Sequence, residues 1–230
     1  MLKAVIFDVD GTLVDSVDLH ARAWQEAFAH FGKHFDYERV RYQIGKGGDQ
    51  LMPVFLTEEE LDEYGEELEE YRGELFKRDY LPRVRGFPSV RELFARVKRE
   101  GLRIALASSA KGDELKTYKR IADIEDLVEE ETSSDDAEKS KPHPDIFEAA
   151  LARLEGVSPA EAVVVGDTPY DAEAAGKAGV RTVGLLCGGF PEDDLRAAGC
   201  VRIYRDAAHL LAEYDSSPLA ARASNAAAHD

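Results

Sequence analysis

The sequence feature that most constrains the fold is the stretch AVIFDVDGT at residues 4–12. Four apolar residues precede two aspartates that are one residue apart, and a glycine follows them. An apolar run of this length before a glycine predicts a buried strand, and period-two geometry predicts that Asp8 and Asp10 leave its end on the same side. Because two such close carboxylates repel each other unless a cation lies between them, we expect a divalent metal site there. An acidic turn after an N-terminal strand is the alternative.

The charge balance of the chain excludes several classes of partner. The 230 residues include 29 Lys and Arg against 46 Asp and Glu, which gives a net charge of −17. That charge repels nucleic acid phosphates and anionic lipid, so we expect neither nucleic acid nor a membrane as a partner. The two cysteines make no disulfide framework, and no signal peptide or transmembrane run is evident. We therefore expect a cytoplasmic protein, either a monomer or a homodimer.

Alternating strands and helices fill the second part of the chain. The apolar patterns predict strands at 102–107, near 127–129, at 162–165, 180–185 and 201–204, and helices at 88–100, 112–122, 144–154, 171–178, 192–198 and 206–213. Strands that alternate with helices imply a parallel sheet with helices on both faces. The expected fold is α/β, with a Rossmann-like parallel-sheet core made of residues 1–15 and 85–215.

A helical block, residues 16–84, interrupts this alternation after the first strand. Apolar residues recur at helical spacing over 17–32 and 58–80, and shorter helices are expected around a glycine-rich loop, Gly45-Lys46-Gly47-Gly48. The block therefore predicts an inserted α-helical cap domain. Residues 216–230 are rich in Ser and Ala without a core pattern, and we expect a disordered tail there.

Polar residues follow several of the expected strands, and in a parallel sheet those strand ends meet at one edge. In chain order they are the Asp8-Val9-Asp10-Gly11-Thr12 run, Ser108, the Lys141-Pro142 loop and the GDTPYD run at 166–171. Together these motifs resemble the four motifs of the haloacid dehalogenase superfamily of phosphotransferases. The helical insert after the first motif resembles that family's C1 cap, so the resemblance covers residues 1–213.

The resemblance implies a role for each matching residue. Asp8 would be the nucleophile that forms an aspartyl-phosphate, and Asp10 would be the general acid and then the general base. Mg²⁺ would be held by the carboxylates of Asp8 and Asp167 and the backbone carbonyl of Asp10, with support from Asp171. The phosphoryl group would be bound by Thr12, the Ser108 side chain, the Ser109 backbone N–H and Lys141.

The acid–base chemistry of carboxyl groups agrees with these roles and adds a requirement on the pKa of Asp10. A carboxyl group with a pKa of ~3.9 is a poor general acid at pH 7, so we expect the pKa of Asp10 to be raised in a closed site. Each residue also has a structural alternative: the serines as helix caps, Lys141 as a solvated loop residue, and Asp167 and Asp171 as turn and cap residues.

Two cap features bear on the substrate. His20 and Trp24 lie one turn apart, and they resemble the branch that contains hexose-phosphate phosphatases and β-phosphoglucomutase, in which the equivalent His lies near the general acid. The alternative is a buried Trp24 beside a surface His20. Lys46 in the glycine-rich loop is expected to meet a distal anion of the substrate, although a plain inter-helix loop is the alternative.

The expected function is hydrolysis of a small phosphorylated metabolite, similar to the reaction of phosphoglycolate phosphatases. A sugar phosphomutase is the second possibility, but that branch carries Glu-Asp where this chain has Gly166-Asp167, and an Arg near Gly47. Dehalogenases lack the second aspartate of the first motif. A non-catalytic phospho-acceptor is the third possibility, and it has no need of Asp10.

Overall fold

The core of the computed structural model, which describes residues 1–220, is a six-stranded parallel sheet. Its strands are β1 (Ala4–Phe7), β4 (Arg103–Ala107), β5 (Glu130–Thr132), β6 (Ala162–Gly166), β7 (Arg181–Leu185) and β8 (Arg202–Tyr204). The strand order is β5-β4-β1-β6-β7-β8, so β1 pairs with both β4 and β6 at the middle of the sheet. The α/β, Rossmann-like fold expected from the sequence is confirmed.

Helices cover both faces of this sheet because the strand residues alternate between two apolar clusters. Val5 and Phe7 of β1 pack with α5 (Val90–Arg99), α6 (Gly112–Ile121) and α10 (Ala207–Ala212). Ala4 and Ile6 face the other way, toward α7 (Asp145–Arg153) and α8 (Pro169–Lys177). Helix α9 (Glu192–Ala197) lies beside α8 and β8. A strand that is apolar on both faces is thereby buried completely.

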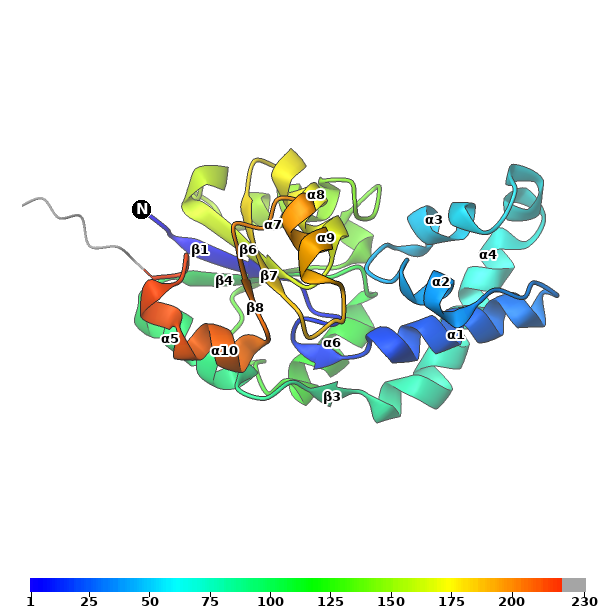
Figure 1. The fold of residues 1–230 in the computed structure, drawn as a ribbon, viewed down its shortest axis with the longest axis horizontal. Coiled ribbons are helices and arrows are strands. Elements are labelled where there is room, and N and C mark those ends of the chain that lie inside the picture. The colour runs from blue at the N-terminus through cyan, green and yellow to red at the C-terminus, as the bar shows by residue number, and fades with distance from the viewer. Residues whose placement is uncertain (221–230) are drawn as a thin grey trace, which may run out of the picture.

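The remaining helices gather at one end of the molecule, beyond the carboxyl edge of the sheet (Figure 1). They are α1 (Val17–His30), α2 (Tyr37–Arg41), α3 (Gly48–Leu51) and α4 (Glu58–Leu75), which continues as a π-helical turn over Phe76–Tyr80. They enclose an apolar cluster of their own, which includes Trp24, Phe28 and Leu68. None of the helices described here combines the length and the apolar composition needed to cross a bilayer.

A short antiparallel pair joins the helical block to the sheet, and the sequence did not predict it. Strand β2 (Val14–Asp15) enters the block and β3 (Arg85–Gly86) leaves it, and the two pair with each other. Two-residue strands have too little periodicity to be recognised from sequence. The exact division into residues 1–15 and 85–215 and residues 16–84 stays a prediction.

Two sequence expectations need correction. The weak strand expected near 127–129 lies instead at Glu130–Thr132, where it pairs with β4 as an edge strand. The tail is also shorter than expected, because Leu219 is fully buried in the main apolar cluster and Ser217 is buried beside it. One apolar residue among Ser and Ala gives no periodic signal. Residues 221–230 of the expected tail lie outside the described residues.

Candidate active site

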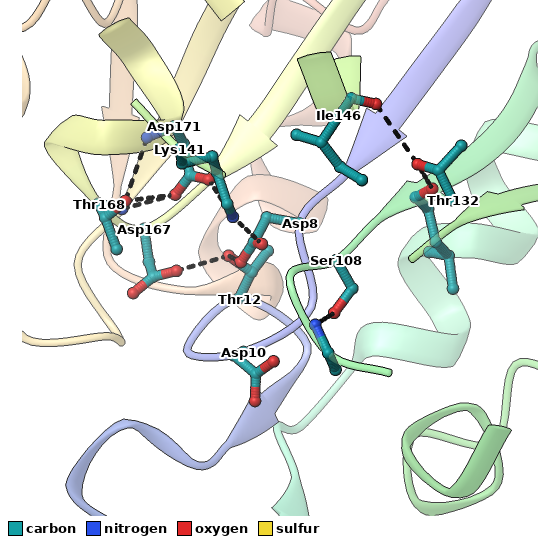
Figure 2. Close-up of polar contacts among 12 residues, drawn as sticks. Asp8, Asp10, Thr12, Ser108, Thr132, Lys141, Ile146, Asp167, Thr168 and Asp171 are labelled. Atoms are coloured by element: carbon teal, nitrogen blue, oxygen red, sulfur yellow. Dashed lines mark hydrogen bonds and ion pairs between the residues drawn. The ribbon is translucent and has the colours of Figure 1, made fainter. Parts of the chain in front are cut away.

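The site lies where β1, β4 and β6 end. Asp8, Ser108 and Asp167 each follow the last residue of one of these neighbouring strands, so the parallel register brings the three residues to one edge. The chain after β5 supplies Lys141 and the chain after β6 supplies Asp171, and Figure 2 shows the Lys141 side chain between Asp171 and Asp8. The predicted convergence of strand ends is therefore present.

Lys141 is a buried cation between two carboxylates and not a solvated loop residue. Its Nζ lies 2.6 Å from Asp8 Oδ1 and 2.8 Å from Asp171 Oδ1, and its side chain is only 2% exposed. Burial alone would lower the pKa of Lys141, but attraction to Asp171 and Asp8 outweighs burial and raises it. Lys141 is therefore a fixed positive charge beside Asp8.

Three carboxylates crowd around this single cation. Oxygens of Asp8, Asp167 and Asp171 lie within 4.8 Å of one another, and all three residues are buried. Burial raises the pKa of Asp8 to about 7 although Lys141 opposes the shift. Burial, together with repulsion from Asp8 and Asp171, raises the pKa of Asp167 well above its ordinary value. When all three carboxyl groups are ionised, they carry more negative charge than Lys141 neutralises.

This donor set fits a divalent cation. Asp167 Oδ2 is buried and has no hydrogen-bond partner among residues 1–220, whereas Asp167 Oδ1 accepts from the Thr12 hydroxyl at 2.8 Å. A buried charged oxygen without a partner is costly, and clustered carboxylate oxygens are the ligands that Mg²⁺ prefers. Thr12 is fully buried and also lies 3.1 Å from Asp8 Oδ2, so its contacts here are with carboxylates.

The Asp171 side chain is fixed by hydrogen bonds in the first turn of α8. Thr168 caps α8, and the Asp171 carboxylate accepts from the Thr168 backbone N–H at 3.0 Å and from the Thr168 hydroxyl at 2.7 Å. This capping box fixes Asp171 Oδ2 while Oδ1 receives Lys141. Gly166 leaves space for Asp171, since a Cβ at residue 166 would lie 2.7 Å from the Asp171 side chain. Asp171 is thus a cap residue that also orients Lys141.

Asp10 has different surroundings from Asp8, and two expectations about it were wrong. Its side-chain carboxylate does not join the carboxylate cluster of Asp8, because its Oδ1 faces Ser16 Oγ at 2.6 Å and His20 Nε2 at 2.9 Å. The chain leaves β1 after Phe7, so period-two geometry no longer applies at residue 10. The pKa of Asp10 is also lowered and not raised: burial favours the neutral form, but attraction and hydrogen bonds from His20 outweigh burial.

His20 is buried and is not a surface residue, and both of its ring nitrogens lie within hydrogen-bond distance of other side chains. Arg72 Nη2 lies 2.6 Å from His20 Nδ1, and an arginine only donates hydrogen bonds. His20 Nε2 lies 2.9 Å from Asp10 Oδ1 and 3.0 Å from the Tyr118 hydroxyl. The ring also stacks on Phe76 at 3.9 Å. His20 therefore lies beside Asp10, the residue that the resemblance assigns as the general acid, and that role stays a prediction.

Several residues of this network were missed by sequence reasoning. Ser16, Tyr118 and Glu114 are single residues with no diagnostic spacing; the fold brings Ser16 to Asp10, and Tyr118 and Glu114 to His20. Arg72 did leave a signal, because it is the only basic residue in the otherwise acidic helix α4. An isolated cation of this kind indicates a specific partner.

The two serines after β4 differ in exposure. Ser108 is fully buried and its hydroxyl accepts from the Ala110 backbone N–H at 3.1 Å, whereas Ser109 lines a cavity beside Asp8. Neither caps α6, since Lys111 occupies the N-cap position. Their position at the strand end agrees with phosphoryl binding, which stays a prediction.

A cavity of about 410 Å³ separates this edge from the helical block. On the core side it is lined by Asp8, Asp10, Ser109 and Lys141, and on the other side by the glycine-rich loop and α4. Lys46 lines it too, but its Nζ donates to Gln43 Oε1 at 2.7 Å and lies 4.7 Å from the Tyr170 ring centroid.

The glycines of the loop allow close approach to the core. A Cβ at Gly45 would lie 2.7 Å from Thr168, and a Cβ at Gly47 would lie 2.1 Å from Ser140. The backbone N–H of Ser140 also donates to Asp49 at 3.1 Å. The helical block is therefore closed onto the core.

Known proteins are similar to this chain in both sequence and architecture. The chain is 29% identical to a phosphorylated carbohydrates phosphatase of Thermotoga maritima over 79% of this chain and 84% of that protein. It is 30% identical to a β-phosphoglucomutase of Bacillus subtilis over 80% of this chain and 83% of that protein. A hydrolase from Pseudomonas syringae superposes with a TM-score of 0.83 at 29% identity, covering 93% of this chain and 98% of that one.

The family model for haloacid dehalogenase-like hydrolases matches residues 5–185, a range that includes the four strand-end motifs. It also includes the whole helical block that closes over them. With motifs, fold and relatives in agreement, the chain belongs to the haloacid dehalogenase-like hydrolases, and it is an enzyme.

Proposed function

We propose that the protein is a Mg²⁺-dependent phosphatase that hydrolyses a small phosphomonoester through an aspartyl-phosphate. The observation that carries the proposal is the pair Asp8 and Lys141, held 2.6 Å apart at the floor of a cavity large enough for a metabolite. The relatives named as phosphatases and the resemblance of the motifs support the same reaction. A cytoplasmic location, and a monomeric or homodimeric state, belong to the same proposal.

In this reaction Asp8 attacks phosphorus, and the bond from phosphorus to the ester oxygen breaks. Asp10 donates its proton to the leaving oxygen and afterwards takes a proton from the water that hydrolyses the aspartyl-phosphate. Lys141 offsets negative charge between Asp8 and the phosphoryl group. Asp10 must hold a proton despite its lowered pKa, so the arriving substrate, with its own negative charge, has to favour the neutral acid.

The metal would be held by the Asp8 and Asp167 carboxylates and the backbone carbonyl of Asp10, with Asp171 in support. The chemistry that a bound Mg²⁺ supplies is neutralisation of charge on the phosphoryl oxygens. The unpartnered Asp167 Oδ2 and the raised pKa values of Asp8 and Asp167 support this assignment. The closed helical block would exclude bulk water during the reaction.

A sugar phosphomutase is the second candidate, favoured by the contact between His20 and Asp10 and by the mutase relative. Two features oppose it. A Glu side chain at residue 166 has no room beside Asp171, and the loop residue Gly47 lies against Ser140 without space for an Arg. A mutase must anchor a second phosphate, and a lysine such as Lys46 lacks the bidentate fork of arginine.

The two candidates give different products from the same incubation. The enzyme is supplied with β-glucose 1-phosphate, Mg²⁺ and a trace of β-glucose 1,6-bisphosphate, and the products are followed by ³¹P NMR. We expect inorganic phosphate and no accumulating isomer. Glucose 6-phosphate that forms faster than inorganic phosphate would replace the phosphatase with the mutase. Asp8→Asn is the control, since neither product should form without the nucleophile.

A further inference from the structure

Two side chains of α6 face the active site from the core, and the proposed reaction assigns no task to either of them. Glu114 and Tyr118 lie one helical turn apart, so they share one face of α6. The Tyr118 hydroxyl donates to Glu114 Oε1 at 2.7 Å, and Glu114 lines the cavity. We call these two residues the α6 pair.

Packing does not explain the carboxyl group of Glu114. The residue is only 6% exposed, and acidic side chains are almost never buried unless they are paired. Within residues 1–220 its one ion-pair partner is His20, whose Nε2 lies 3.8 Å from Glu114 Oε1. A carboxyl group buried beside one hydroxyl and one distant imidazole lowers the stability of the fold. A role at the site would account for this cost.

The ring and the hydroxyl of Tyr118 have different surroundings. The ring is fully buried in the main apolar cluster, so it holds the hydroxyl in one place. The hydroxyl lies 3.0 Å from His20 Nε2 in addition to its contact with Glu114. Burial raises the pKa of Tyr118 well above its usual value, so the hydroxyl keeps its single proton. Because that proton is donated to Glu114, the hydroxyl oxygen is left to face His20.

The α6 pair and His20 come from different parts of the molecule. His20 belongs to α1 of the helical block, whereas the α6 pair belongs to the core. His20 Nε2 thus lies within hydrogen-bond distance of two groups of the core, Asp10 Oδ1 and the Tyr118 hydroxyl. The imidazole ring can make these two contacts only while the helical block is closed onto the core.

We propose that the α6 pair positions the general acid: Tyr118, itself held by Glu114, receives His20 when the helical block closes and keeps it against Asp10. This inference rests on the proposed function, in which Asp10 protonates the leaving oxygen. Both members of the pair are positioning residues, because they act through His20 and not on the reacting atoms. A misplacement of about 1 Å can cost about 10²-fold in rate, so the loss of one hydroxyl should be measurable.

The test compares two substrates that differ in their need for a general acid. Benzyl phosphate releases an alkoxide, which must be protonated as it leaves, whereas p-nitrophenyl phosphate releases a stabilised phenolate that needs little protonation. Both compounds are aromatic monoesters of similar size. The measured quantity is kcat/KM, because it covers the steps up to departure of the leaving group and excludes the later hydrolysis of the aspartyl-phosphate.

Tyr118→Phe removes the hydroxyl and keeps the buried ring. We expect kcat/KM for benzyl phosphate to fall at least about tenfold, and kcat/KM for p-nitrophenyl phosphate to fall less than about threefold. An equal fall for both substrates would mean that the hydroxyl serves only folding or closure, and it would overturn the inference. Unchanged values for both substrates would overturn it as well.

Tyr42→Phe is the matched control. The Tyr42 hydroxyl also joins the helical block to the core, because it donates to Asp194 of α9, but Tyr42 does not line the cavity. This variant should leave the ratio of the two kcat/KM values as it is. A shift of the ratio in Tyr42→Phe like that in Tyr118→Phe would assign the effect to weaker closure in general and contradict the inference.

Variants of Glu114 test the second member of the pair. Glu114→Gln keeps an oxygen that accepts from the Tyr118 hydroxyl and should keep most of the ratio, whereas Glu114→Ala should shift it in the same direction as Tyr118→Phe. If Glu114 acts through Tyr118, Glu114→Ala combined with Tyr118→Phe is no slower on benzyl phosphate than the slower single variant. Losses that multiply in the double variant would reveal a separate route and refute the positioning role of Glu114.

Asp10→Asn distinguishes failure of this inference from failure of the proposed function. It should lower kcat/KM for benzyl phosphate far more than kcat/KM for p-nitrophenyl phosphate. If Asp10→Asn shifts the ratio and Tyr118→Phe does not, the α6 pair has no positioning role. If Asp10→Asn lowers both values equally, Asp10 is not the general acid, and the inference falls with that part of the proposed function. No phosphate release from either compound by the wild-type protein would refute the phosphatase itself.

Discussion

Replacing Asp167 with asparagine should stabilise the metal-free protein and abolish its response to Mg²⁺. The side chain is buried among Asp8 and Asp171, with carboxylate oxygens within 4.8 Å, and one of its oxygens has no partner among residues 1–220. Asparagine has the same shape without the charge. The change removes repulsion that Lys141 does not fully offset.

The size of the effect follows from Coulomb's law. At a separation of 4.8 Å, the upper limit here, and an effective dielectric constant of about 20, each pair of ionised carboxylates repels by roughly 3.5 kcal/mol. Asp167 takes part in two such pairs, and attraction to Lys141 cancels much of the sum. We expect a net gain of about 2 kcal/mol in the free energy of unfolding, which for a chain of this length raises Tm by about 4–8 °C.

The gain should grow with pH. The pKa of Asp167 is raised in the folded protein, so between the ordinary value of 3.8 and the raised value the folded state holds a proton that the unfolded state has lost. Stability of the wild-type protein therefore falls as pH rises through that window. The asparagine side chain of the Asp167→Asn variant does not titrate, so the difference in stability between the two proteins is largest on the alkaline side.

Thermal unfolding in EDTA and in Mg²⁺, at pH 5 and pH 8, measures both effects. Mg²⁺ should raise Tm of the wild-type protein at pH 8 and leave Asp167→Asn nearly unchanged. Asp62→Asn, at an exposed position of α4, is the control for loss of one negative charge. The reasoning is refuted if Asp167→Asn is less stable than the wild type in EDTA at pH 8, or if Mg²⁺ stabilises both proteins equally.

The other predictions concern activity and metal affinity. Asp8→Asn should reduce phosphate release at least about 10³-fold with an unchanged circular dichroism spectrum, because the covalent step is lost; a tenth of wild-type kcat would contradict the role of nucleophile. Because the pKa of Asp8 is about 7, protons compete with Mg²⁺, and calorimetry should show about tenfold tighter Mg²⁺ binding at pH 8 than at pH 6. Ca²⁺ should inhibit, since its looser coordination misplaces the nucleophile; full activity with Ca²⁺ alone would exclude this. Arg72→Gln should lower kcat more than it raises KM and alter the pH profile of kcat, because Arg72 acts on Asp10 through His20; a change in KM alone would indicate substrate binding instead.

The sheet and its strand-end residues were predictable because both depend on local pattern. Four apolar residues before Asp8 specify a buried strand wherever it lies in the sheet, and parallel strands carry their ends to one edge. Lys141 could be placed near Asp8 only through the resemblance, since a lysine in a loop has no periodic signal. The Lys141 side chain is only 2% exposed, and it lies between Asp8 and Asp171, which come from other segments of the chain.

The surroundings of Asp10 could not be predicted in the same way. Sequence spacing suggested that Asp10 would act with Asp8, but the chain turns after Phe7 and the Asp10 carboxylate meets Ser16 and His20 at the start of the helical block. Those contacts decide the pKa of Asp10, and they reversed the expected direction of its shift. The pKa of a buried residue depends on which side chains the fold turns toward it, and an apolar pattern carries no information about that.

The lowered pKa of Asp10 also connects closure of the helical block with chemistry. Arg72 and His20 belong to the block; His20 contacts Asp10 and Arg72 contacts His20 because α1 and α4 are closed onto the core. Without substrate they hold Asp10 in its ionised form, which cannot donate a proton. A phosphomonoester brings negative charge into the cavity and favours protonation of the nearest carboxylate. In the proposed mechanism Asp10 would therefore become a proton donor only after the substrate has filled the cavity.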